Sequence, residues 1–163
     1  MIPQLATVRA RIRSIPFESP HYRCGIHAGY ADVTPTWGYK LFRSAMERDK
    51  NFDLQSRAYL HGLAPNVRDC FAERAYGGIS VYGFSTESIP FTEKERFYGF
   101  RHVDVFNVKD YNEWRRTHLS IIQDLQYQLE KIGITSRDVS NWDNVGYLRG
   151  GMVCIDFSCE ELD

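Results

Sequence analysis

The chain has 163 residues, of which 43% are hydrophobic and 14% aromatic, and its formal net charge at pH 7 is −1. A chain of this length can bury a substantial core as one compact domain, and its composition is typical of a folded protein rather than a disordered one. The nearly neutral charge gives no bulk electrostatic reason for binding to nucleic acid or to an anionic membrane surface.

Hydrophobic periodicity predicts strands and one helix in the first half of the chain. In Thr7–Phe17, apolar residues alternate with arginines, which is typical of a half-buried strand. Lys40 lies in the middle of the second predicted strand. Phe52–Gly62 has a helical pattern that ends ahead of Pro65. Four of the predicted strands are Thr7–Phe17, Trp37–Arg43, Asn66–Phe71 and Ile79–Thr86.

The second half of the chain predicts a long helix and a closing β-hairpin. The helix Asp110–Ile132 has the strongest helical pattern of the sequence and ends at Gly133. Two apolar runs, Asn144–Leu148 and Met152–Phe157, flank a predicted Gly150-Gly151 turn. The order of elements predicts an α+β protein, with a five-stranded antiparallel sheet between Thr7 and Phe84 packed on the first helix.

Cysteine usage and the N-terminal sequence predict a cytoplasmic protein. The four cysteines form no C-x-x-C pair, which favours free thiols in a reducing compartment. The N-terminus lacks a basic region followed by an apolar run, so no signal peptide is expected. No window approaches the ~20 apolar residues that a membrane helix needs.

The closing segment resembles the nucleotide-binding part of protein kinases. Asn144 precedes the predicted hairpin, and Asp156 follows it within Asp156-Phe157-Ser158. This arrangement is similar to the catalytic loop and the metal-binding Asp-Phe-Gly segment of that family, in which the Asn and the Asp hold Mg²⁺ on the nucleotide phosphates. A cation would also compensate a carboxylate at the end of a buried strand.

Other segments extend the resemblance over most of the chain. Lys40 in "GYKLFR" looks like the strand-three lysine that pairs with the phosphates, and the helix followed by "LAPNV" is similar to the αC helix and its turn. Val81–Ser88 looks like the strand that runs into the hinge, where the backbone of Glu87–Ile89 would meet an adenine. The resemblance implies an N-lobe at 1–87, a connection at 88–109 and a C-lobe remnant at 110–163, as in small phage-encoded kinase-like proteins.

Several departures from the family imply a degenerate site. The phosphate loop lacks its closely spaced glycines, and Gln55 stands where the resemblance expects the glutamate that pairs with Lys40. Asp138 is the candidate catalytic base, with Asp143 as a rival, but its spacing to Asn144 differs from the family. The sequence also has no activation segment, Ala-Pro-Glu motif or helical lower lobe, which would remove substrate positioning.

These observations leave three hypotheses about function. The first is a cytoplasmic pseudokinase, in the host cytoplasm if phage-encoded, that binds ATP and Mg²⁺ weakly and regulates or inhibits another protein by binding it. The second is an active minimal phosphotransferase, and the third is a structural or inhibitory α+β module without nucleotide. Trp114, Ile121, Ile122, Leu125 and Leu129 cannot all face one sheet in the predicted arrangement, so we expect a homodimer or a protein partner on the Asp110–Ile132 helix.

Overall fold

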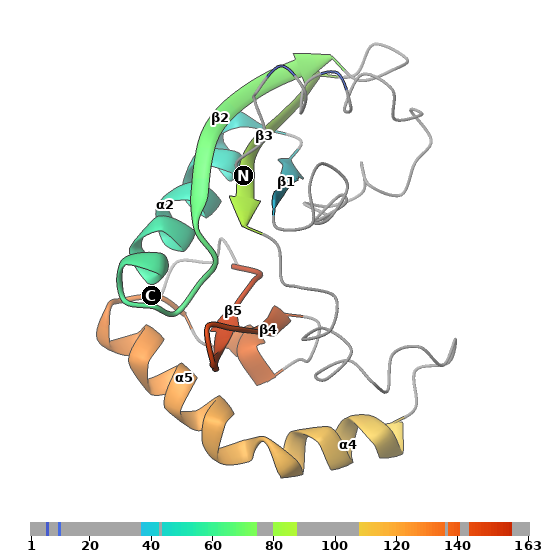
Figure 1. Cartoon of the computed structure of the whole chain (residues 1–163), viewed down its shortest axis with the longest axis vertical. Coiled ribbons are helices and arrows are strands. Elements are labelled where there is room, and N and C mark those ends of the chain that lie inside the picture. The colour runs from blue at the N-terminus through green and yellow to red at the C-terminus, as the bar shows by residue number, and fades with distance from the viewer. Residues whose placement is uncertain are drawn as a thin grey trace. The chain divides into compact units, whose positions relative to one another are not determined.

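The computed structural model shows a mixed α+β protein (Figure 1). It describes residues 37–42, 44–74, 80–87, 108–135, 137–140 and 144–157, together with Ala6 and Ala10. The helices and strands are β1 (Trp37–Phe42), α2 (Ala45–Leu60), β2 (Val67–Arg74), β3 (Ser80–Glu87), α4 (Val108–Thr117), α5 (Leu119–Lys131), the 3-10 helix η2 (Arg137–Ser140), β4 (Val145–Leu148) and β5 (Gly151–Cys154).

The described residues belong to two compact units, and the boundary between the units crosses α2. The first unit ends at Asp53 and resumes at Asn66, so it contains β1, β2, β3 and the first half of α2. The second unit contains Leu54–Pro65 together with α4, α5, η2, β4 and β5. The second half of α2 and the turn after it are therefore part of the second core.

The first unit is built on an antiparallel sheet with the strand order β1-β3-β2. Side chains of paired residues lie on the same face of a sheet. Phe42 and Phe84 share the face that packs against Phe52 of α2, and the Phe52 and Phe84 rings meet edge to face with centroids 5.4 Å apart. The Arg48 guanidinium of α2 also donates to the Phe71 carbonyl at 2.8 Å. The first half of α2 is thus fixed to the sheet.

The centre of this sheet admits only a residue without a side chain. At Gly83, a Cβ atom would approach the Lys40 carbonyl oxygen and the Phe71 ring to 2.5 Å. The Phe71 ring occupies the space above Gly83, and the two residues are direct register partners. Glycine at this position therefore allows a large aromatic side chain to cross the middle strand.

Helices α2 and α5 end with the same hydrogen-bonded turn. After α2, the Leu63 amide donates to Ala58 O and the Gly62 amide to Tyr59 O, with Gly62 at φ 73°. After α5, the amides of Ile134 and Gly133 make the equivalent bonds to Leu129 and Glu130. This pattern is a Schellman motif, which places glycine in the left-handed conformation and an apolar residue directly after it. The predicted stops at both glycines are confirmed.

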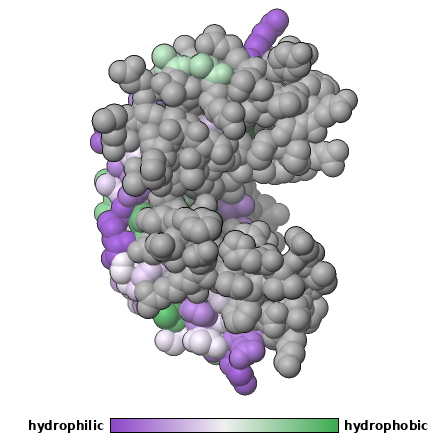
Figure 2. Space-filling model, turned by 45° about the vertical axis from the view of Figure 1, so that its right-hand side comes forward, coloured by the Kyte–Doolittle hydropathy of each residue, from purple (hydrophilic) through white to green (hydrophobic). Residues whose placement is uncertain are grey.

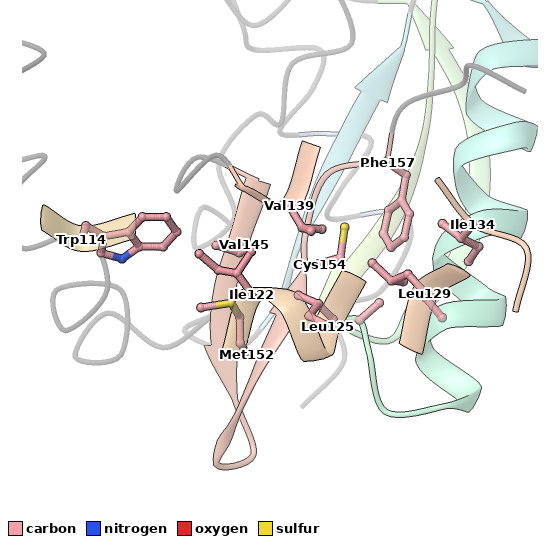
Figure 3. Close-up of a cluster of buried hydrophobic side chains, with 12 residues drawn as sticks. Trp114, Ile122, Leu125, Leu129, Ile134, Val139, Val145, Met152, Cys154 and Phe157 are labelled. Atoms are coloured by element: carbon pink, nitrogen blue, oxygen red, sulfur yellow. The ribbon is translucent and has the colours of Figure 1, made fainter. Parts of the chain in front are cut away.

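The second unit has a larger apolar core, which Figure 3 shows in close-up. Residues of α5, η2 and the β4–β5 hairpin point toward one another there. Ala58 of α2 and Ala64 of the turn after α2 complete the core. Its buried members are Ala58, Ala64, Trp114, Ile122, Leu125, Leu129, Ile134, Val139, Val145, Met152, Cys154 and Phe157. Burial of this apolar surface supplies most of the driving force for folding of the unit.

The predicted single helix Asp110–Ile132 is divided into two helices at His118, and Figure 1 shows α4 and α5 meeting at an angle. His118 has φ −103° and ψ 9°, which lie outside the helical region. Its ring Nδ1 lies 2.8 Å from the Trp114 carbonyl, and its ring stacks on the Trp114 indole. A side chain bonded to a helical carbonyl of the preceding turn is a recognised cause of bending.

Other element predictions are confirmed in part. The predicted strand Trp37–Arg43 corresponds to β1, and the following two strands correspond to β2 and β3, which extend to Arg74 and Glu87. The described residues contain three strands of the predicted five-stranded sheet. Of Thr7–Phe17, only Ala10 is described, and its backbone is helical rather than extended. No helix in the described ranges is long and apolar enough to cross a membrane.

Candidate functional site

The closing hairpin brings the two predicted metal ligands, Asn144 and Asp156, next to each other. Val145 pairs with Cys154 and Leu148 with Gly151, so Asn144 and Asp156 lie at the open end of the hairpin. The Asn144 carbonyl accepts the Ile155 amide at 2.9 Å and the Asp156 amide at 3.4 Å. The register of β4 and β5 thus makes neighbours of two residues that lie twelve positions apart in the sequence.

The turn of this hairpin lies one residue earlier than predicted. Arg149 and Gly150 form it with φ values of 52° and 80°, and Gly151 is the first residue of β5. Two positive φ angles in a two-residue loop are typical of a type I′ turn, which suits glycine and asparagine better than arginine. The Arg149 guanidinium lies over the Tyr59 ring of α2, 5.7 Å from the ring centroid. It also donates to Ala64 O, in the turn after α2, at 3.4 Å.

The donor atoms of Asn144 and Asp156 fit a hard divalent cation. A carboxylate and an amide supply oxygen, which Mg²⁺ prefers, and Mg²⁺ completes its octahedron with water or phosphate oxygens. Both residues are half-buried in the structure. Among the described residues, no group of three or more His, Cys, Asp or Glu side chains could hold a metal ion. A metal held here by protein side chains alone would therefore be weakly bound.

Lys40 has an unusual position for a charged residue, because its side chain is 0% exposed in the middle of β1. It is the register partner of Phe84, and its Nζ lies 5.9 Å from the centroid of the Phe84 ring. An ammonium at this distance from an aromatic ring is attracted by the ring quadrupole. Lys40 thus lies on the face of the sheet that carries Phe42 and Phe84, which pack against α2.

Gln55 has a structural hydrogen bond within the second unit. Its side chain is 0% exposed, and its Nε2 donates to the Pro65 carbonyl at 3.0 Å. A glutamate at this position, as the kinase resemblance expects, would present an acceptor to another acceptor when ionised. The amide therefore joins the second half of α2 to the turn that follows the helix.

The predicted hinge residue Glu87 is also engaged in local structure. Its amide donates to Asn66 O at 2.9 Å, and its carboxylate accepts the Asn66 amide at 3.1 Å. The Glu87 amide is thus already bonded and would not donate to an adenine without breaking this bond. Ile89, the other predicted hinge residue, lies outside the described residues.

Of the two candidate catalytic bases, Asp138 and Asp143, only Asp138 lies within the described residues. The backbone of Asp138 forms part of η2, the short 3-10 helix between α5 and the hairpin. Its neighbour Val139 is buried in the second core. Asp143, the rival base, lies outside the described residues. Asp138 therefore belongs to the same unit as Asn144 and Asp156.

The helical segment on which we expected a partner, Asp110–Ile132, exposes fewer apolar side chains than its sequence indicated. Trp114, Ile122, Leu125 and Leu129 are all buried, whereas Ile121 is 44% exposed. The prediction that these five side chains cannot all face one sheet is consistent with the exposure of Ile121. The other four are buried in the second core, which also contains residues of η2, of the β4–β5 hairpin and of the second half of α2. In the view of Figure 2, hydrophobic colour on the described surface forms small separate spots.

Cys70 is an exposed residue of β2, and the pKa of its thiol is raised. Desolvation by burial raises the pKa of Cys70, while the Arg48 guanidinium lowers it and the carboxylates of Asp49 and Asp69 raise it again. A raised pKa decreases the thiolate fraction at neutral pH. The thiol therefore lacks the activation expected of a catalytic nucleophile.

The sequence analysis did not identify Cys154 as part of the site. Its thiol lies 3.0 Å from the Asp156 carbonyl, and its amide donates to Leu63 O at 2.8 Å. The bond to Leu63 depends on the packing of the hairpin against the turn that follows α2, which no local pattern specifies. The Cys-x-Asp spacing at the end of an apolar run was the only available signal.

No protein-family model, curated protein or solved structure matches this chain. The resemblance to protein kinases therefore depends on the residues of the sequence alone.

Proposed function

We propose that this protein is a kinase-like regulator with a degenerate nucleotide site, which acts mainly by binding another protein. The observation that carries the proposal is the register of the closing hairpin, because it places Asn144 beside Asp156. These are the two residues that the kinase resemblance assigns to the metal. A carboxylate and an amide oxygen would hold Mg²⁺, which would neutralise charge on nucleotide phosphates.

The burial of Lys40 limits the affinity that the proposed nucleotide site can have. A lysine in a strand usually faces solvent, yet this one is fully buried beside Phe84. The resemblance assigns Lys40 to the phosphates. Because its side chain has no exposed surface, a phosphate would reach the ammonium only after neighbouring side chains move. That requirement lowers the apparent affinity by the fraction of molecules in the open state.

The degenerate character of the site follows from Gln55 and Glu87. Gln55 donates to Pro65 O instead of supplying a carboxylate, and the Glu87 amide is bonded to Asn66 O. Loss of one charge-assisted pair costs on the order of 1.5–3 kcal/mol, or one to two decades in affinity. We therefore expect ATP to bind no tighter than roughly the high-micromolar range, which favours regulation by protein binding over phosphoryl transfer.

Among the described residues, α5 offers a protein partner a mixed rather than a purely apolar surface. The exposed large hydrophobic residues of α5 are Leu119, Ile121 and Tyr127, at 45%, 44% and 58% exposure. Lys131 lies over the Tyr127 ring at 5.3 Å, which adds a positive charge to this surface. We assign the partner contact to this mixed surface of α5 rather than to a continuous apolar face.

Thermal unfolding with ATP tests the nucleotide site. At about 5 mM ATP and Mg²⁺, a dissociation constant near 0.5 mM would stabilise the protein by about 1.4 kcal/mol, which raises Tm by roughly 3–6 °C for a chain of this size. We expect that rise to disappear with EDTA and in Asp156→Asn. The matched control is Asp124→Asn, which removes an exposed carboxylate of α5 and should keep the rise.

Two outcomes of this experiment contradict the proposal. If Mg-ATP leaves the wild-type Tm unchanged at every concentration, the protein is a structural or inhibitory module without a nucleotide site. If Asp156→Asn and Asp124→Asn respond alike to Mg-ATP, the nucleotide binds elsewhere. Transfer of the γ-phosphate to a protein substrate, followed with radiolabelled ATP, would instead indicate an active phosphotransferase.

A further inference from the structure

The backbone of Asp156 is held from two sides. Its amide donates to the Asn144 carbonyl at 3.4 Å, and its carbonyl accepts the Cys154 thiol at 3.0 Å. Cys154 is itself fixed, because its amide donates to Leu63 O at 2.8 Å and its side chain is 2% exposed. Two bonds from one buried residue thus join the turn after α2 to the backbone of Asp156.

We propose that Cys154 is a positioning residue for Asp156, and that it orients the carboxylate toward a metal–nucleotide complex without touching the metal. The inference rests on the proposed function, since it assumes that Asp156 is a metal ligand. A thiol is a weak donor, but it acts here on the peptide group of the ligand residue. Groups that orient a metal ligand change the affinity for the metal although they lie outside its coordination sphere.

Cys154 is also a member of the second core, so its positioning role must be distinguished from packing. Its neighbour Val153 is also 2% exposed, but Val153 belongs to a separate small cluster with Leu148 and Ile155. Removal of the Val153 methyl groups deletes buried apolar atoms, yet it leaves the thiol contact in place. A positioning role therefore predicts that metal–nucleotide affinity and stability respond differently to the two substitutions.

The experiment measures binding of Mn²⁺·ATP to the full chain by calorimetry, together with amide hydrogen exchange. The hydroxyl of Cys154→Ser keeps a donor, and we expect its affinity to stay within about twofold of wild type. Cys154→Ala removes the donor and should bind about three- to fivefold more weakly, as a weak hydrogen bond allows. Exchange of the Asp156 amide should be faster in Cys154→Ala than in Cys154→Ser.

Val153→Ala is the matched control, which should melt at a lower temperature than the wild type, as a buried truncation does, but bind Mn²⁺·ATP like the wild type. If Cys154→Ala binds as tightly as the wild type, the positioning role is wrong while the proposed function stands. If the wild type itself does not bind Mn²⁺·ATP, the proposed function fails and this inference fails with it. Should Cys154→Ala not fold, Cys154→Val fills the space without a donor and replaces it.

Discussion

At the scale of single residues, Gln55 occupies the position of α2 at which the kinase resemblance expects a glutamate. The amide of Gln55 is fully buried and its Nε2 donates to the Pro65 carbonyl. An amide can donate to a carbonyl, whereas an ionised carboxylate cannot. The residue that departs from the kinase pattern is therefore the one that this hydrogen bond requires.

Gln55→Glu should destabilise the protein by about 2–3 kcal/mol at neutral pH, because a buried carboxylate would face the Pro65 carbonyl. Burial raises the pKa of such a glutamate in the folded state, so the folded state binds the proton more tightly than the unfolded state. The penalty should therefore shrink as the pH falls through that raised pKa toward the unfolded value. Urea unfolding between pH 4 and pH 8 measures it.

Gln55→Met is the control for this prediction, because it removes the donor without adding a charge. Its loss of about 1–2 kcal/mol should not depend on pH. A Gln55→Glu variant as stable as wild type at neutral pH would contradict the prediction. It would show that the folded state compensates the charge of the carboxylate.

Single residues also mark where the sequence stopped being informative. Apolar periodicity located the hairpin and both of its ends, so Asn144 and Asp156 could be named as neighbours. The positive φ of Arg149 could not be predicted, because arginine gives no turn signal and its partners Tyr59 and Ala64 are far away in the sequence. Burial of Lys40 depends on packing against α2, which periodicity does not describe.

At the scale of elements, the start of α2 shows a signal that was present but was not used. The helix begins at Ala45 rather than at Phe52, and the Ser44 hydroxyl accepts the Glu47 amide at 3.1 Å. Ser-x-x-Glu is a capping-box sequence, which often marks a helix N-terminus. The charged stretch after it lacks an apolar stripe, so hydrophobic periodicity alone placed the start too late.

Ser44→Ala should destabilise the protein by about 1 kcal/mol, because the Glu47 amide loses its acceptor at the first turn of α2. Ser44→Asp should keep the stability within a few tenths of a kcal/mol, since aspartate is an equally good N-cap. Chemical denaturation of the three proteins measures the difference. Equal stability of Ser44→Ala and wild type would show that the helix N-terminus is satisfied in another way.

At the scale of the whole molecule, the second core decides how much surface remains for a partner. The described core residues of α4 and α5 are covered from within the unit, and the exposed apolar residues of α5 are separated by polar ones. Stable protein interfaces bury about 800 Å² on each partner. From the described surface of α4 and α5, we therefore expect a monomer at micromolar concentration. The homodimer expected from the sequence is the alternative that the measured mass decides.

Light scattering at about 10 µM and a pair of adjacent substitutions test this expectation. Ile121→Glu changes a half-exposed residue and should alter stability by less than about 0.5 kcal/mol, with the mass unchanged. Ile122→Glu buries a carboxylate in the second core and should cost more than about 3 kcal/mol. A dimeric mass that Ile121→Glu converts to the monomer would restore the helix as a self-association surface.

The division of α2 between two cores has a consequence for dissecting the protein by genetic or proteolytic means. Neither core is encoded by one uninterrupted stretch of sequence, since the chain leaves the first at Asp53 and returns to it at Asn66. A fragment that ends after β3 would carry Ala58 and Ala64 without the helices and hairpin that cover them. Such a fragment should aggregate when expressed alone. Complementation by two separately produced halves, rather than autonomous folding of either half, is the behaviour that this architecture favours.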